Sequence, residues 1–115
     1  MSQIILDEHL GRGQVLYPIQ HWITAKRQLN ANNFTIGKAY IFGSYAKGRQ
    51  TEWSDIDVAL VSDQFEGNRF YDHCKISPYL IKVDTSLEVH PFSPENFTKD
   101  NPFVEEIIET GIQII

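Results

Sequence analysis

Two aspartates follow a glycine-rich turn in the segment FGSYAKGRQTEWSDID, residues 42–57. Asp55 and Asp57 open an apolar run, and in a strand such residues point to the same face with Cα atoms about 6.5–7 Å apart. Two carboxylates at that spacing repel each other, and a divalent cation turns the repulsion into binding, since Mg²⁺ takes carboxylates together with substrate phosphates. The spacing favours a metal site, although the pair alone also fits a solvent-facing turn in which Ser54 caps Asp55.

The turn before the aspartates has the parts of an anion-binding loop. Gly43 lets backbone N–H groups approach a phosphate, and Ser44 offers a hydroxyl that would also cap a following helix. Lys47 and Arg49 add positive charge. Gly48 is not followed by the Lys-Ser/Thr pair of a P-loop, so that motif is a near miss. Alone, the loop fits an ordinary strand-to-helix turn; beside the two carboxylates it predicts a site for a metal-bound nucleoside triphosphate.

Hydrophobic spacing and turn signals place the elements around this site. They predict a helix over 14–32, strands over 38–44 and 55–61, a helix over the first half of 68–83, a strand over 85–92 and a helix over 101–111. Pro78 leaves the second half of the second helix open, and Pro91 is expected to end the third strand. Ser93 and Pro94 predict a helix start. The last four residues, IQII, fit either an edge strand or part of an interface.

The final helix has the clearest boundaries. Asn101 is expected to cap it, Pro102 to occupy its first position and Gly111 to end it. The whole order is helix, strand, strand, helix, strand, helix. It predicts an α+β or α/β fold in which a small sheet is flanked by helices, with function at the ends of the strands.

Composition narrows the possible partners and compartment. The chain has 115 residues and a net charge of −5, and we find no basic stripe, so a nucleic acid is not expected as a partner. Cys74 is the single cysteine, which excludes an internal disulfide and a Cys-rich zinc site. The first residues do not form a signal peptide, and no apolar run approaches the roughly 18 residues of a membrane span. A cytoplasmic protein without membrane contact is the expectation.

The motif resembles a known signature. Gly43-Ser44, a gap of ten residues and then Asp55-x-Asp57 are similar to the pattern of DNA polymerase β-type nucleotidyltransferases. The small size and the ending resemble the minimal nucleotidyltransferase (MNT) family, whose members pair with HEPN-domain proteins in prokaryotic toxin–antitoxin systems. The resemblance implies that residues 1–115 form a single nucleotidyltransferase domain with a small mixed sheet and flanking helices.

The resemblance also implies roles for individual residues. Gly43 and Ser44 correspond to the residues that hold the triphosphate, with Lys47 and Arg49 as further nucleotide-binding candidates. Asp55 and Asp57 correspond to the catalytic metal ligands. Many relatives have arginine at the positions of Tyr45 and Lys47 here, and lysine keeps the charge without the bidentate geometry. This departure bears on triphosphate binding more than on the metal site.

A third acidic residue is expected on a neighbouring strand. In the segment TSLEVHPF, alternation places Glu88 on one face together with His90. Glu88 is the candidate for third metal ligand and possible base. Asp84 is its rival, because it lies an even number of residues from Glu88 and so falls on the same face in the alternation. His90 would either assist the reaction or be an ordinary residue near the strand end.

The implied reaction is transfer of AMP from Mg-ATP to a hydroxyl, expected to be a tyrosine, of a partner HEPN toxin. The chain would act as the antitoxin of a type VII-like toxin–antitoxin pair and form a hetero-oligomer with the toxin. Two other functions stay open: a binding-only antitoxin that neutralises by contact, and a small-molecule nucleotidyltransferase of the kind that modifies aminoglycosides. The sequence does not specify the base preference, the stoichiometry, or whether one or two Mg²⁺ ions bind.

Overall fold

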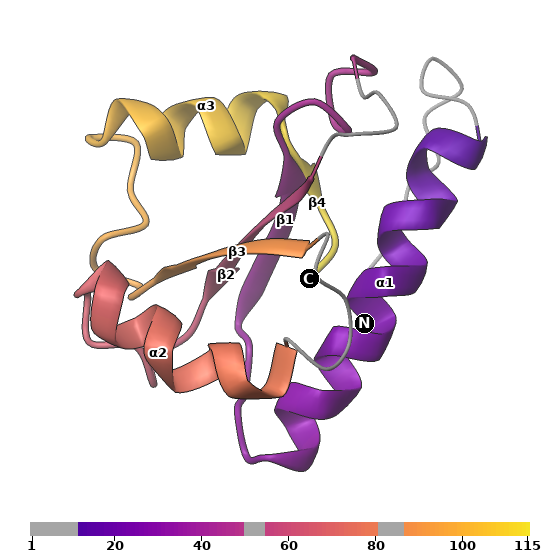
Figure 1. Cartoon of the computed structure of the whole chain (residues 1–115). Coiled ribbons are helices and arrows are strands. Elements are labelled where there is room, and N and C mark those ends of the chain that lie inside the picture. The colour runs from indigo at the N-terminus through magenta and orange to yellow at the C-terminus, as the bar shows by residue number, and fades with distance from the viewer. Residues whose placement is uncertain (1–11, 50–54, 81–86) are drawn as a thin grey trace.

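The computed structural model describes residues 12–49, 55–80 and 87–115. Its elements are, in chain order, α1 (Arg12–Ala31), β1 (Lys38–Phe42), β2 (Ile56–Val61), α2 (Arg69–Leu80), β3 (Leu87–Phe92), α3 (Pro102–Thr110) and β4 (Ile112–Gln113) (Figure 1). The predicted order of helices and strands is confirmed, and the IQII segment contributes the short strand β4. None of the helices in the described ranges combines the length and the apolar character needed to cross a membrane.

The four strands form one mixed sheet in the order β3-β2-β1-β4. β1 runs antiparallel to both β2 and β4, whereas β2 and β3 are parallel. The chain passes through α2 between the two parallel strands, as expected because a parallel pair needs a long crossover connection. A small mixed sheet flanked by helices is the fold class that the sequence predicts.

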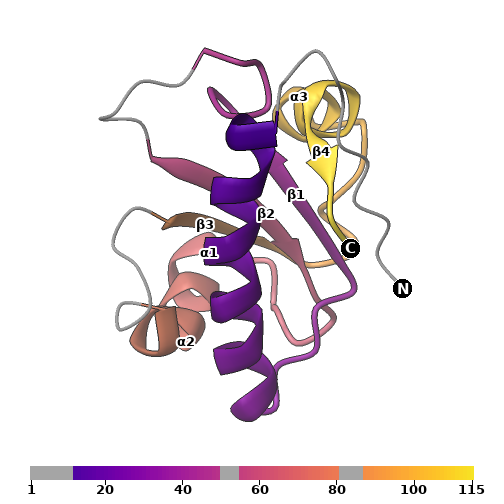
Figure 2. The same ribbon diagram turned by 90° about the vertical axis from the view of Figure 1, so that its right-hand side faces the viewer.

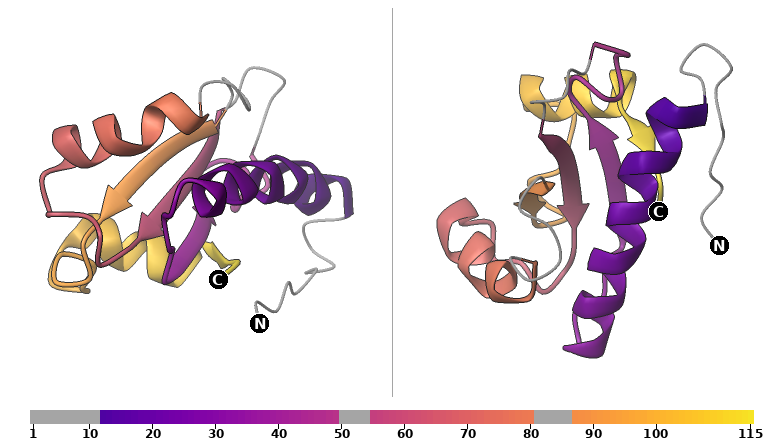
Figure 3. Two further views of the ribbon diagram at one scale, coloured as in Figure 1. Left: turned by 90° about the horizontal axis from the view of Figure 1, so that it is seen from below. Right: turned by 45° about the vertical axis from the view of Figure 1, so that its right-hand side comes forward.

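Each face of the sheet is covered by its own helices. α1 and α2 lie on one side of the strands and α3 on the other (Figures 2 and 3). The core on the α1–α2 side includes Leu29, Ile41, Ile56, Val58, Ile76 and Val89. The core on the α3 side includes Tyr40, Ala59, Phe92, Val104 and Ile107. Because strand residues alternate between faces, the positions of Asp57, Glu88 and His90 belong to the face of the sheet that α3 covers.

Two prolines, Pro78 and Pro91, lie inside their elements rather than at the ends. Pro78 lies inside α2, which continues to Leu80. The proline removes the hydrogen bond that its N–H would make and crowds the carbonyl one turn earlier, and the buried side chains of Ile76 and Leu80 keep the last turn packed despite this cost. The helix therefore extends further than the first half of its segment.

Pro91 likewise lies within β3 and pairs with Leu60 of β2. The next residue, Phe92, accepts a hydrogen bond from the N–H of Ser62 at 3.2 Å, so the backbone of Phe92 faces β2. The backbone of Pro91 must then face the opposite edge, where, within the described residues, no strand pairs with β3. The expectation that Pro91 ends the strand is wrong, because a proline is tolerated at an edge position of this kind.

The boundaries of α3 are confirmed, and the predicted helix start at Ser93 is not. Asn101 accepts a hydrogen bond from the N–H of Phe103 at 2.9 Å, Pro102 is the first helical residue, and the N–H of Gly111 donates to Ile107 at 2.8 Å. The segment after Ser93 forms only a hydrogen-bonded turn. The N–H groups of Asn96 and Phe97 donate to the carbonyl of Ser93 at 3.1 and 3.2 Å, which closes one turn before the chain leads into α3.

Candidate active site

The loop after β1 is wound into tight turns. Gly43 and Gly48 have positive φ angles of 75° and 67°. In this loop, the N–H of Lys47 donates to the carbonyl of Gly43 at 3.1 Å, and the N–H of Arg49 donates to the carbonyl of Ser44 at 2.8 Å. No helix follows Ser44 within residues 44–49, because the left-handed conformation of Gly48 interrupts helical winding.

Gly43 lies directly against the side chain of Asp57. Its neighbour Phe42 is paired with Asp57 across β1 and β2. A Cβ atom on Gly43 would lie 2.5 Å from Oδ2 of Asp57, which is closer than nonbonded atoms approach. The positive φ favours glycine at this position, and the Cβ of any other residue would have to displace the adjacent carboxylate. The glycine and the second aspartate of the motif, well separated in sequence, are neighbours in space.

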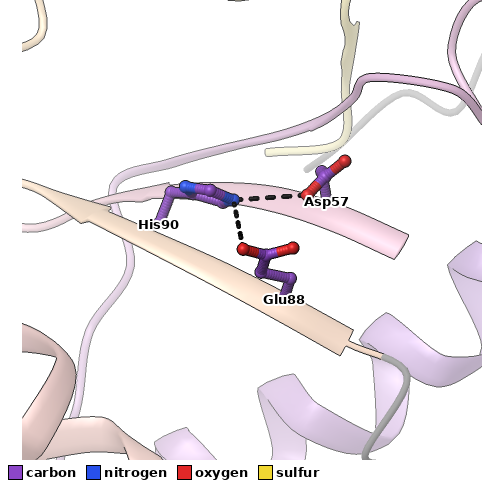
Figure 4. A group of neighbouring side chains, drawn as sticks. All are labelled: Asp57, Glu88 and His90. Atoms are coloured by element: carbon purple, nitrogen blue, oxygen red, sulfur yellow. Dashed lines mark hydrogen bonds and ion pairs between the residues drawn. The ribbon is translucent and has the colours of Figure 1, made fainter. Parts of the chain in front are cut away.

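A cluster of three side chains forms where β2 and β3 lie side by side. Asp57 is in register with Glu88, and His90 follows two residues later on the same face. One oxygen of each carboxylate and one ring nitrogen of His90 all lie within 4.8 Å of one another (Figure 4). The side chains of Asp57, Glu88 and His90 are 24%, 56% and 14% exposed. The two carboxylates are thus open to solvent and to a ligand, while the histidine is mostly covered.

His90 contacts charged groups through both ring nitrogens. Its Nε2 lies 3.3 Å from Oδ1 of Asp57 and 3.9 Å from Oε1 of Glu88. Its Nδ1 lies 2.8 Å from Nη2 of Arg69 at the start of α2. The imidazole also packs edge-on against Phe42 and Phe103, with ring centroids 5.0 and 6.0 Å away. The histidine is held on every side by identified neighbours.

The structure brings only part of the predicted carboxylate set together. Asp55 is exposed, lies one residue before β2 begins and is not part of the cluster. Glu88 is the cross-strand neighbour of Asp57, and the rival Asp84 lies outside the described residues. The roles of Asp55, Asp57 and Glu88 as metal ligands stay predictions.

The two predicted cations of the loop lie in different surroundings. Nζ of Lys47 is 2.7 Å from Oε1 of Glu106 on α3, while Arg49 is exposed. By its hydrogen bond and then by its charge, Lys47 holds the pKa of Glu106 below the ordinary value of a glutamate. Because folding lowers the pKa of Glu106, the contact is fully formed at pH values above the ordinary glutamate pKa. It is lost as the pH falls through the folded-state pKa of Glu106.

Two residues near the site were not identified from the sequence. Arg69 reaches His90 across 21 positions of the chain, and Glu106 reaches Lys47 across 59. Contacts at such separations depend on how the helices pack on the sheet, so no local spacing marks them. One indication of this part of the site is present in the sequence, which is the strand alternation that places His90 on the same face as Glu88.

The profile of the family described as "Polymerase beta, Nucleotidyltransferase" matches residues 26–115, which include the glycine loop, the aspartate pair and all four strands. The chain belongs to this family. It is a nucleotidyltransferase, and the predicted enzyme class and fold are both confirmed.

Known relatives agree with this assignment. The chain is 28% identical over 99 residues to "Putative protein adenylyltransferase MJ1379" of Methanocaldococcus jannaschii, with 86% of this chain and 96% of the relative covered. A crystal structure of "a putative nucleotidyltransferase" from Sulfolobus solfataricus superposes with a TM-score of 0.58 at 20% identity, covering 90% and 86% of the two chains. A crystal structure described as "the toxin-antitoxin with AMP-PNP" gives 0.51 at 23% identity, covering 82% and 69%. The two structural likenesses show the fold.

We predict that Gly43→Ala reduces nucleotidyl transfer far more than its effect on stability explains. The added methyl group costs about 1–2 kcal/mol at a left-handed φ. It also displaces Asp57, and a shift of about 1 Å at a reacting centre lowers rates by roughly 10²-fold. Thermal melts and initial rates measure the two effects separately.

Ile36→Val is the matched control for this substitution. Ile36 is buried in the core on the α1–α2 side, next to the end of β1 opposite Gly43, and loss of one methyl group there costs about 0.5–1.5 kcal/mol. The control should lower the melting temperature to a similar extent and keep activity. Equal activity losses in the two variants would contradict a specific contact between Gly43 and Asp57.

We predict that Glu106→Gln tightens ATP binding by releasing Lys47 toward the loop. The gain should be about two- to fivefold in Kd, the range expected for an exposed ion pair. Isothermal titration with a non-hydrolysable ATP analogue measures it. Glu109→Gln is the control, because Glu109 lies on the same helix and contacts Lys99 at 3.9 Å instead. If both variants bind alike, Lys47 has no part in holding the triphosphate.

Proposed function

We propose that this chain transfers AMP from Mg-ATP to a hydroxyl group of a partner protein. The observation that carries the proposal is the placement of Asp57 beside Glu88 and against the Gly43 loop. Membership of the nucleotidyltransferase family supplies the reaction class. The similarity to a relative named as a protein adenylyltransferase, over 86% of this chain, supports a protein as the acceptor.

We further propose that the partner is a HEPN-domain toxin, modified on a tyrosine, with this chain as antitoxin in a type VII-like pair. The shared fold with a toxin–antitoxin structure that contains AMP-PNP supports both ATP and a toxin as partners. AMP on the toxin would add charge and bulk at its active surface. A hetero-oligomer of the two proteins follows from this role.

The carboxylates of the cluster fit Mg²⁺, which prefers oxygen ligands and commonly keeps several waters. Asp57 and Glu88 would hold the ion, and the partial exposure of both side chains leaves room for water and phosphate oxygens. Asp55 would complete the set from its position just before β2. When bound, Mg²⁺ would neutralise phosphate charge and lower the pKa of the attacking hydroxyl.

The reaction requires the residues of this chain to position the acceptor hydroxyl in line with the bond that breaks in ATP. The acceptor oxygen forms a bond to the α-phosphorus of ATP while the bond from that phosphorus to the departing pyrophosphate breaks. Gly43 and Ser44 would hold the triphosphate through backbone N–H groups and the hydroxyl. Glu88, the more exposed carboxylate of the pair, would accept the proton that the hydroxyl loses.

The acceptor has a route to Glu88 along an open groove of about 430 Å³ between α2 and β3. Its lining comprises Arg69, Phe70, His73, Cys74, Glu88, Val89, His90 and Pro91. The Phe70 side chain is largely exposed at 72% and packs edge-on against Tyr71, also exposed, with ring centroids 5.8 Å apart. An apolar rim beside two residues of the cluster suits a protein segment better than a free nucleotide.

We predict that Asp57→Asn abolishes labelling of the partner. The full-length protein, Mg²⁺ and ATP labelled at the α-phosphate are incubated with the product of the neighbouring gene, and label on the partner is counted. Removing one negative charge from the metal site should lower transfer by roughly 10²-fold or more. Asp63→Asn is the matched control, since Asp63 is exposed beyond the other end of β2.

The same variants separate the competing functions. Undiminished labelling by Asp57→Asn would contradict the proposed site. If the Asp57→Asn protein transfers no label but still protects fully against the toxin, neutralisation by contact alone would be favoured. Label transferred to a small hydroxyl compound and never to the partner would favour a small-molecule nucleotidyltransferase.

We predict that Phe70→Ala weakens transfer to the protein acceptor while ATP binding is unchanged. Loss of an exposed aromatic anchor at an interface raises KM for the partner, by about tenfold for a cost near 1.4 kcal/mol. Ile23→Ala on α1 is the control, because Ile23 is also exposed, at 40%, and lies on a different helix. An unchanged KM for the partner would show that it does not use this groove.

A further inference from the structure

The guanidinium of Arg69 is fixed in place by two aromatic rings. Its Cζ atom lies 5.7 Å from the ring centroid of Phe92 and 5.7 Å from that of Phe103. The segment leading into α2 is itself held, because the buried carboxylate of Asp72 accepts hydrogen bonds from the N–H groups of Glu66 and Gly67 at 2.8 and 2.9 Å. Arg69 is thus presented to the sheet from a supported helix start.

The contact between Arg69 and His90 determines where the imidazole carries its proton. Nη2 of Arg69 lies 2.8 Å from Nδ1 of His90. A guanidinium has only donors, so Nδ1 must be the acceptor and has no hydrogen of its own. A ring that accepts at Nδ1 carries its proton on Nε2. The arginine therefore selects one tautomer of the histidine.

The proton on Nε2 is directed at Asp57. Nε2 lies 3.3 Å from Oδ1 of Asp57, within reach of a hydrogen bond, and the other oxygen, Oδ2, lies against Gly43. The ring cannot easily turn away, because Phe42 and Phe103 pack against it and it is only 14% exposed. Asp57 is held from both sides, by a donor at one oxygen and by a close backbone at the other.

We propose that His90 and Arg69 are positioning residues for Asp57 and that His90 is not a metal ligand. His90 belongs to the cluster by distance, yet an Nε2 that carries a proton has no lone pair for a cation. Arg69 sets the tautomer, His90 donates to Oδ1, and Oδ2 of Asp57 remains directed at the loop side of the site. The inference rests on the proposed role of Asp57, but the state of the ring is measurable without any reaction.

The first test is nuclear magnetic resonance of the full chain labelled with ¹⁵N at histidine. The two ring nitrogens are distinguished by their shifts at alkaline pH, and His90 is assigned among the four histidines by its loss in His90→Gln. We expect the Nε2–H tautomer both without metal and at saturating Mg²⁺. Arg69→Met should give a mixture of tautomers. A proton on Nδ1, or loss of the Nε2 proton when Mg²⁺ is added, would overturn the inference.

The second test compares two substitutions of His90 in the labelling reaction. His90→Gln keeps an N–H donor near the position of Nε2, whereas His90→Phe keeps the packing against Phe42 and Phe103 and removes the donor. Loss of an outer hydrogen bond to a metal ligand costs about 10–100-fold in metal affinity or activity. We expect that loss, seen as a higher Mg²⁺ requirement, in His90→Phe, with substantial rescue in His90→Gln.

The outcomes are separable from those of the proposed function. A folded His90→Phe protein with unchanged Mg²⁺ dependence would contradict the positioning role while leaving protein adenylylation intact. If no partner is ever labelled, the affinity for Mn²⁺ is measured instead by electron paramagnetic resonance. We then expect His90→Gln to bind Mn²⁺ more tightly than His90→Phe. Equal Mn²⁺ affinities in the two variants would then overturn the inference.

Discussion

The carboxylate of Asp57 lies between the backbone of Gly43 and the ring of His90, and the other features of the site are arranged around it. This position depends on two strand pairings at once. β1 brings Phe42 and hence Gly43 opposite Asp57, and β3 brings Glu88 beside it. A shift of either register by one residue would turn the partner side chain to the other face of the sheet. The large apolar cores on both faces oppose such shifts.

A charged residue is tolerated on the central strand β2 because it lies near the start of the strand, outside the two-sided core. β2 is buried over most of its length, with Ile56, Val58 and Leu60 facing the α1–α2 side. Asp57 escapes burial because it is near the start of the strand, where the α3-side core has not yet closed over it. The strand end therefore combines rigid support with access to solvent, which is what a site for a highly charged ligand needs.

The sequence predicted the elements well and the long-range contacts poorly. Period-2 alternation identified the shared face of Glu88 and His90, and the capping residues of α3 gave its bounds, because these signals are local. Pro91 was wrongly expected to end its strand, and Pro78 left the end of its helix open, because the cost of a proline depends on its surroundings, which only tertiary packing and sheet order decide. Asp55, which precedes the strand by one residue, is not part of the cluster. Arg69 and Glu106 had no local signal at all.

Among the described strands β3 lies at the edge of the sheet, and in the proposed reaction this constrains how a protein acceptor would approach the site. Exposed strand edges commonly recruit a partner strand through their free N–H and C=O groups. Pro91 presents its backbone to that edge and has no N–H, so strand addition is disfavoured beside Glu88 and His90. The groove along α2 provides the alternative, with Phe70 as an exposed apolar contact. In the proposed reaction, an acceptor that entered there would reach Glu88 through this groove, and a hydroxyl at the tip of a long side chain would extend further into it than a hydroxyl close to its own backbone.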